Sequence, residues 1–440
     1  MNRRRFSRLS AAGILGVTLP LDAVSRAVGD QEIRVDGTRL NRRMAELARF
    51  GANDAGGIDR VAFSQADLDA RAWVRSLWEE AGLTTSVDVA GNLWGRRPGS
   101  DPSRPPLILG SHIDSVPGGG NYDGQVGSMG ATEVAATLHD QGRTTRHPLE
   151  FVIFPNEEGG KTGSRALAGQ VEAMELELET ASGFTIGEGL RRLGGDPDRL
   201  SDVVRAPGSA TAFLELHVEQ GGVLDADGID IGVVEGIVGI MRWTVTVDGT
   251  TNHAGTTPMD RRSDALVAAA RFVDAVHRTA LDMPGRQVAT VGRIAVEPGA
   301  PNVIPGRATL SLEVRDLTME GIERVYDAVR ARADAIGRDT GTSFTFERFY
   351  TSGAAPTHPH IRNVVEASAE ALGLSHRRMP SGAGHDAQSI AVFAPVGMIF
   401  VPSRQGISHA PDEFTEPGDV TNGTDTLLRT LLALDASPPA

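Results

Sequence analysis

Histidine and carboxylate residues gather in a few short segments, each close to the end of an apolar run. Six of them have side chains that could act together: His112, Asp123, Glu157, Glu158, His217 and His409. Imidazole and carboxylate without thiolate are the ligands of hydrolytic Zn, Mn, Co or Ni sites. A carboxylate shared by two such ions holds them about 3.5–4 Å apart with water between them. We therefore expect a site for two divalent metal ions.

The adjacent pair Glu157 and Glu158 suggests a division of labour, because two neighbouring glutamates at a strand end cannot easily bind the same ion. One is expected to bind metal and the other to move protons. Each segment alone is weak evidence, since an aspartate beside glycines is usually a turn former and a lone histidine at a strand end is usually structural. The prediction of a metal site rests on the occurrence of several such segments in succession along the chain.

The apolar runs that precede these residues read PLILGSH, EFVIFPNEE, FLELHVE and GMIFVPS. They alternate with helical stretches, of which the first clear one follows Ser64, with Asp67 completing a capping box. This alternation predicts an α/β fold, with a mostly parallel sheet covered by helices on both faces. Ligands of such sheets gather at the carboxyl ends of the strands, which is where the polar residues lie.

The pattern changes from about Gly236. RWTVTVDG and ATLSLEVRD alternate apolar and polar residues, as half-exposed antiparallel strands do, and the helical stretches SDALVAAARFVDAVHR and MEGIERVYDAVRARADAIG accompany them. We predict a smaller α+β domain inserted over residues 236–354. The catalytic domain would then comprise residues 29–235 and 355–440.

Composition narrows the range of functions. A chain of 440 residues exceeds the size of a single hydrophobic core, so two domains are expected. The net charge of −14 argues against nucleic acid or an anionic membrane as the main partner. The absence of cysteine excludes a disulfide scaffold, a thiolate metal site and a cysteine nucleophile.

The first residues have the layout of an export signal. Arg3, Arg4, Arg5 and Phe6 precede the weakly apolar run LSAAGILGVTLPLDAV and then small residues. The RRxF arrangement resembles a twin-arginine signal, and the run is too short for a permanent membrane anchor. We expect residues 1–28 to be a signal and the protein to be periplasmic or secreted. A basic N-terminus on a cytoplasmic protein is the alternative.

Five motifs carry a resemblance to a known family: YDGQVG, ELHVEQG, NHAGTTPM, SGAGHDA and GISHAPDE. They resemble the M20 metallopeptidase superfamily, within it the amidase, hydantoinase and carbamoylase group. That group includes N-carbamoyl-L-amino-acid hydrolases, β-ureidopropionases and allantoate amidohydrolases. The likeness runs from about Asn41 to Asn422.

The resemblance implies roles for the metal-binding side chains. Asp123 would bridge two ions, with His112 and His409 on one ion and Glu158 and His217 on the other. Glu157 would be the general base, and Asp114 would orient His112, as carboxylates behind a ligating histidine do.

The resemblance also implies how substrate is held. His253 would reach the active site of a partner subunit and stabilise the oxyanion, which makes a homodimer the expected state. Asn302 and Arg315 would grip the substrate carboxylate, and Gln220 and His385 would line the pocket. For His253 a surface loop, and for Arg315 an ordinary salt bridge, are the alternatives.

The implied reaction is hydrolysis of a carbamoyl or ureido C–N bond by a hydroxide that bridges the two metal ions. The substrate would be a small molecule with a carboxylate, such as an N-carbamoyl-L-amino acid, ureidopropionate or allantoate. Two alternatives are an aminoacylase- or dipeptidase-like hydrolase and a non-catalytic binding module, although the latter should have lost ligands. The stretch NEEGGKTGSRALAG lacks an Arg-Phe pair and is about five residues shorter than in the family, which leaves the substrate open.

Overall fold

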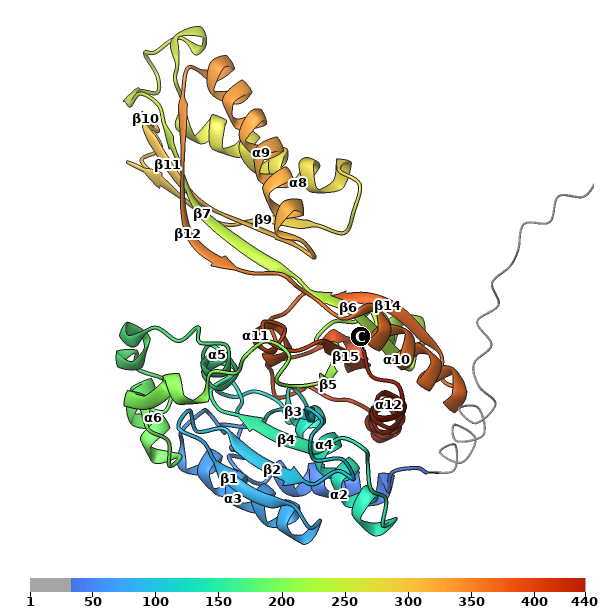
Figure 1. Ribbon diagram of the computed structural model, residues 1–440. Helices are drawn as coiled ribbons and strands as arrows, with labels where there is room; N and C mark the ends of the chain where they lie inside the picture. The colour runs from blue at the N-terminus through green and yellow to red at the C-terminus, as the bar shows by residue number, and fades with distance from the viewer. Residues whose placement is uncertain (1–32, 440) are drawn as a thin grey trace, which may run out of the picture. The chain divides into compact units, whose positions relative to one another are not determined.

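The computed structural model describes residues 33–439, which Figure 1 colours along the chain. The predicted export signal, residues 1–28, lies outside the described residues. Among the helices of the described part, none is long and apolar enough to cross a membrane.

A nine-stranded sheet runs in the order β1-β2-β4-β3-β5-β15-β6-β13, and β14 pairs with β6. The four central strands β4, β3, β5 and β15 are parallel, and antiparallel strands flank them. The central strands are almost entirely buried and apolar, as expected of strands covered on both faces. The strands are β1 (Thr84–Val87), β2 (Leu93–Arg97), β3 (Leu107–His112), β4 (Leu149–Phe154), β5 (Ala212–Val218), β6 (Ile231–Ile237), β13 (Ala355–Pro356), β14 (His376–Ser381) and β15 (Val396–Val401).

Helices cover both faces of this sheet (Figure 1). On one face α4 and α12 approach Leu216 so closely that a Cβ at Gly127 would lie 2.1 Å from the Leu216 carbonyl oxygen. On the other face α5 and α11 pack against Phe213 and its neighbours. The helices are α2 (Gly37–Leu47), α3 (Gln65–Glu80), α4 (Gln125–Asp140), α5 (Thr162–Leu167), α6 (Ile186–Arg192), α7 (Val223–Asp227), α10 (Pro359–Leu372), α11 (Asp386–Ile390) and α12 (Pro417–Ala436), with 3-10 turns η2 (Ala173–Glu177), η3 (Pro197–Val203) and η5 (Arg404–Gly406).

These layers confirm the predicted α/β class, and the flanking antiparallel strands make the sheet mixed. The helix predicted after Ser64 is α3, whose first turn is capped by Ser64 Oγ accepting from the Asp67 N–H. The Asp67 carboxylate accepts from the Phe63 N–H at 2.8 Å, so the reciprocal bond reaches one residue further back than predicted. Helix α2 precedes α3 and was not predicted.

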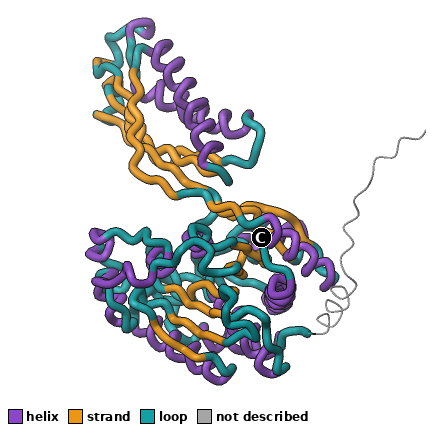
Figure 2. The backbone as a smooth tube through the Cα atoms, viewed as in Figure 1, coloured by secondary structure: helices purple, strands orange, loops and turns teal. Residues whose placement is uncertain are grey.

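A second, four-stranded antiparallel sheet has the order β12-β7-β11-β9. Helices α8 and α9 pack along one face of it (Figure 2) and bury the apolar residues of the alternating strands, such as Trp243 and Leu310. All these elements fall within the predicted inserted segment, residues 236–354. They are β7 (Gly239–Asp248), β9 (Val288–Glu297), β11 (Arg307–Asp316), β12 (Ser343–Ser352), α8 (Ala265–Asp282) and α9 (Met319–Thr340), beside the small ladder of β8 (Asn252–His253) with β10 (Val303–Ile304) and the turn η4 (Met259–Arg261).

Candidate metal centre

The ends of the parallel strands supply most of the centre. His112 is the last residue of β3, His217 lies one residue before the end of β5, and the glutamate pair Glu157 and Glu158 follows β4. Asp123 stands just before α4. Because β4, β3 and β5 are parallel neighbours, their carboxyl ends meet along one edge of the sheet. The loop after β15, the next strand along, brings His409 to the same edge.

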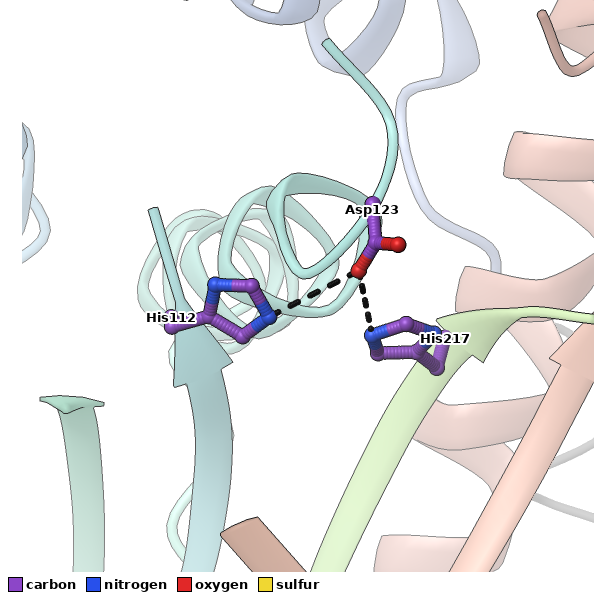
Figure 3. Close-up of side chains that lie close together, drawn as sticks. All are labelled: His112, Asp123 and His217. Atoms are coloured by element: carbon purple, nitrogen blue, oxygen red, sulfur yellow. Dashed lines mark ion pairs between the residues drawn. The ribbon is translucent and has the colours of Figure 1, made fainter. Parts of the chain in front are cut away.

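The carboxylate of Asp123 lies between two sets of ligand atoms. Its Oδ1 is 3.2 Å from His217 Nε2 and 3.7 Å from His112 Nε2, the two ion pairs drawn in Figure 3. Its Oδ2 is 3.2 Å from His409 Nε2, which in turn is 3.4 Å from Glu158 Oε2. Among the described residues three groups of side chains could each hold a metal ion, and Asp123 belongs to two of them: His112, Asp123 and His217, and Asp123, Glu158 and His409. The third group, Glu215, His217 and His385, shares His217 with the first.

This grouping differs from the one that the family resemblance implied, which paired His112 with His409 and Glu158 with His217. The sheet explains the difference. Strands β3 and β5 are neighbours in register, with Leu109 opposite Leu214, so their terminal histidines lie side by side with ring centroids 6.0 Å apart. His409 and Glu158 meet the other oxygen of the aspartate.

The donor set fits divalent cations. His112 Nδ1 lies 3.0 Å from the Asp114 carbonyl oxygen, and His217 Nδ1 lies 2.9 Å from that of Val218. A carbonyl can only accept, so Nδ1 carries the proton in both rings and Nε2 presents a lone pair. The N–H of Gly124 donates to His217 Nε2, in agreement with this tautomer. In both rings Nε2 is the atom that faces the Asp123 carboxylate, and a cation bound between them would replace any proton held there.

Burial shapes the charges of the centre. It raises the pKa of Glu157 to about 8 and of Glu158 to about 11, and the neighbouring carboxylates reinforce both shifts. It lowers the pKa of His112 to about 4. Burial opposes protonation of His217 as well, but Asp123 outweighs it and raises the pKa to about 9. Bound cations would stabilise the ionised form of these carboxylates and so offset the effect of burial.

Asp114 supports the centre through two different groups. Its carbonyl oxygen, not its carboxylate, makes the close contact with His112 Nδ1, since the nearest carboxylate oxygen is 3.7 Å away. The carboxylate instead accepts from the main-chain N–H groups of Glu157 and Glu158, at 3.4 and 3.3 Å. Burial raises the pKa of this carboxyl to about 7. Asp114 therefore orients both the histidine and the glutamate pair.

Two of the predicted substrate residues lie within the centre. Gln220 Nε2 donates to Asp123 Oδ2 at 2.5 Å, and its backbone adopts φ +56°. His385 is buried, shares a hydrogen bond of 2.7 Å with Ser381 Oγ, and packs edge-on against the ring of His217 with centroids 4.4 Å apart.

The other three predicted substrate residues belong to the inserted segment. His253 is exposed, and its Nδ1 accepts from the N–H groups of its own loop. Asn302 is exposed, and its main-chain carbonyl oxygen accepts from the Ala254 N–H. Arg315 donates to Glu313 Oε1 at 2.7 Å and to the Gly382 carbonyl at 2.6 Å. Within residues 33–439 none of the three forms a hydrogen bond or ion pair with the ligands of either metal group.

Four charged residues around the centre were not among the predicted site residues. Glu413 and Glu215 are buried carboxylates with complete hydrogen bonding, the latter from Ser111 Oγ and the Ala387 N–H. Asp386 is fully buried, and Lys161 of the shortened loop donates to Gln388. A glutamate inside the apolar run FLELHV, and one within the same motif as His409, were signals that could have identified two of them.

The chain is similar in sequence to a family of known proteins. The model of the peptidase family M20/M25/M40 matches residues 108–433. An N-carbamoyl-L-amino acid amidohydrolase of Geobacillus stearothermophilus is 38% identical over 405 residues, covering 91% of this chain and 99% of that protein. An allantoate amidohydrolase of Bacillus subtilis is 32% identical, covering 88% and 95%.

A solved structure agrees with these sequence matches. The amidase of the hydantoinase/carbamoylase family from Burkholderia multivorans is 37% identical with a TM-score of 0.84, covering 92% of this chain and all of that one. The family match spans well over half of the chain, and the relatives are matched along almost their whole length. This chain belongs to peptidase family M20/M25/M40.

Proposed function

We propose that this protein is a metal-dependent amidohydrolase that cleaves the carbamoyl or ureido C–N bond of N-carbamoyl-L-amino acids or related ureido acids. The observation that carries the proposal is the position of Asp123 between two groups of ligand atoms, with Glu157 beside them. The names of the relatives, N-carbamoyl-L-amino acid amidohydrolase and allantoate amidohydrolase, support the class of bond.

Two divalent ions would occupy the centre, one held by His112, Asp123 and His217 and the other by Asp123, Glu158 and His409. The ligand types suit Zn, Mn, Co or Ni. Such ions supply Lewis acidity: they lower the pKa of bound water and polarise a carbonyl group.

Glu157 is proposed as the general base. Its Oε2 lies 3.8 Å from His112 Nε2, yet it belongs to neither ligand group, so its carboxylate is free to handle protons. Glu157 takes a proton from the attacking water, whose oxygen bonds to the carbamoyl carbon, and then delivers it to the leaving nitrogen as the C–N bond breaks. The products are the free amine and carbamate, which decomposes to ammonia and carbon dioxide.

The inserted segment, residues 236–354, is proposed to act as a lid and dimerisation domain. It carries His253, which would stabilise the oxyanion in the partner subunit's active site of a homodimer. Asn302 and Arg315 would bind the substrate carboxylate. The Arg315 guanidinium would then give up its hydrogen bonds to Glu313 and the Gly382 carbonyl. Gln220 and His385 would complete the pocket.

We also propose that residues 1–28 direct export of the folded protein by a twin-arginine signal, which would place the enzyme in the periplasm or outside the cell. A protein exported after folding can acquire its metal ions before it crosses the membrane.

Ammonia release from a substrate panel tests the proposed reaction. The metal-loaded protein is offered N-carbamoyl-L-amino acids, 3-ureidopropionate, allantoate, N-acetyl amino acids and dipeptides. We expect ammonia from at least one carbamoyl or ureido compound and its loss on treatment with a chelator. Hydrolysis of N-acetyl amino acids or dipeptides alone, measured by release of the free amine, would overturn the proposed bond class.

Glu157→Gln is expected to lower kcat by a factor of roughly 10²–10⁴, because the amide cannot accept the proton of the attacking water. Metal content, measured by elemental analysis, should stay at the wild-type level. Glu347→Gln, which changes an exposed glutamate of β12, is the control and should keep full activity. Full activity of Glu157→Gln with intact metal content would remove Glu157 from the role of base.

Gly124→Ala is expected to abolish metal binding by the His112 group. A Cβ at this position would lie 2.3 Å from His112 Nε2, so the ring must move away from Asp123. Gly118→Ala is the matched control: both glycines have positive φ, +76° and +65°, but a Cβ at Gly118 meets nothing within 4 Å. The control should cost about 1–2 kcal/mol of stability and keep its metal. Equal metal binding by both variants would contradict the assignment.

The role of His253 in the partner subunit can be tested by complementation. His253→Ala and Glu157→Gln homodimers should each be nearly inactive. Mixed dimers formed by subunit exchange contain one site with both residues intact, so an equal mixture should recover about a quarter of wild-type activity. Absence of recovery in dimers shown to have exchanged would exclude a contribution across the interface.

A further inference from the structure

Glu413 joins the two loops that carry Asp123 and His409. Its Oε1 accepts from the N–H groups of Tyr122 and Asp123, at 2.9 and 3.0 Å. Its Oε2 accepts from Ser408 Oγ at 2.9 Å and from the His409 N–H at 3.2 Å. Glu413 is 4% exposed, so these hydrogen bonds replace water around the carboxylate.

The surrounding main chain is shaped to admit this carboxylate. A Cβ at Gly120 would lie 2.4 Å from the Glu413 side chain, so glycine there leaves room for it. The backbone of His409 has φ +56°, a left-handed conformation that few residues other than glycine adopt. The bond from its N–H to Glu413 helps to hold this conformation, which aims the imidazole at Asp123.

Ser408 extends the link to the side chain of the aspartate. Its Oγ lies 2.9 Å from Asp123 Oδ2 and 2.9 Å from Glu413 Oε2. Because a hydroxyl has a single proton, it can donate to only one of these carboxylates at a time. Glu413 therefore influences both the main chain of Asp123 and a hydrogen-bond donor to its carboxylate.

The other ligand group depends on Glu413 only through the shared Asp123. The rings of His112 and His217 are oriented by the carbonyl oxygens of Asp114 and Val218, and neither histidine touches Glu413. The two groups share Asp123, but only the one with Glu158 and His409 depends on the relative position of two loops that are about 290 residues apart in sequence.

We propose that Glu413 is a positioning residue for the metal ion held by Asp123, Glu158 and His409, and that it contributes little to the ion held by His112 and His217. The inference rests on the proposed metal centre. Groups that orient metal ligands from behind typically change metal affinity by roughly 10–100-fold when they are removed.

Glu413→Gln tests this selectivity. The amide has one oxygen to accept with, and its NH₂ must face a pair of donors. The two main-chain N–H groups of Tyr122 and Asp123 cannot rotate, so the amide oxygen should face them and the NH₂ should face the His409 N–H. Titration of the metal-free full-length protein with Co²⁺, followed by visible absorption, should then show one ion bound as in wild type and one weakened by roughly 10–100-fold.

Glu416→Gln is the matched control, since Glu416 lies on the same loop in an exposed ion pair with Arg404. It should bind both ions as wild type does. Thermal unfolding of the metal-free proteins separates positioning from general stability, because a merely structural role would lower the unfolding temperature without changing one affinity selectively.

The outcomes are distinct. Wild-type protein that binds no Co²⁺ would contradict the proposed function itself. Wild type with two ions and Glu413→Gln with two ions of unchanged affinity, or an equal weakening of both, would contradict the positioning role alone. If Glu413→Gln does not fold, Ser408→Ala removes the hydroxyl part of the same link, and its failure to weaken one ion selectively would contradict the proposal.

Discussion

Buried groups of like charge must be held together against their mutual repulsion, and the rest of this structure is arranged to do so. Asp114, Asp123, Glu157 and Glu158 lie within one cluster, and burial raises the pKa of three of them. The exception is Asp123, whose pKa stays well below its usual value despite burial because His217 and its other histidine neighbours surround it. The aspartate is the one carboxylate here that the protein alone keeps ionised, which suits a bridging ligand.

The scaffold meets this constraint by positioning main-chain groups, which in turn orient the ligand side chains. Parallel strands β4, β3 and β5 bring their ends to one edge, and carbonyl oxygens at those ends set the histidine tautomers. The Asp114 carboxylate also acts on main chain, since it accepts from the N–H groups of Glu157 and Glu158. The ligands therefore have few alternative positions in the absence of an ion, which reduces the entropy lost when one binds.

The sequence was sufficient to predict the fold class and the residues that would gather, because apolar runs identify buried parallel strands and polar residues at their ends share an edge. It was insufficient for the grouping of His112 with His217, which depends on the order of strands in the sheet. It was also insufficient for Asp114, where the main-chain oxygen makes the contact that the carboxylate was expected to make. Glu413 shares a sequence motif with His409, but a linear pattern does not show that its carboxylate will accept from the N–H of Asp123.

The positions of Asp123 and Glu413 in the chain also bear on how the protein is made. Every residue of the segment 236–354 is synthesised between them, so the loop that carries His409 and Glu413 emerges only after the second sheet is complete. Contacts of such long sequence separation form late in folding. A ribosome-bound chain that ends before Glu413 contains His112, Asp123 and His217 but not the contacts that complete the other ligand group. Tight binding of an ion by Asp123, Glu158 and His409 would therefore begin only once this loop has folded, whereas the group of His112, Asp123 and His217 is present earlier.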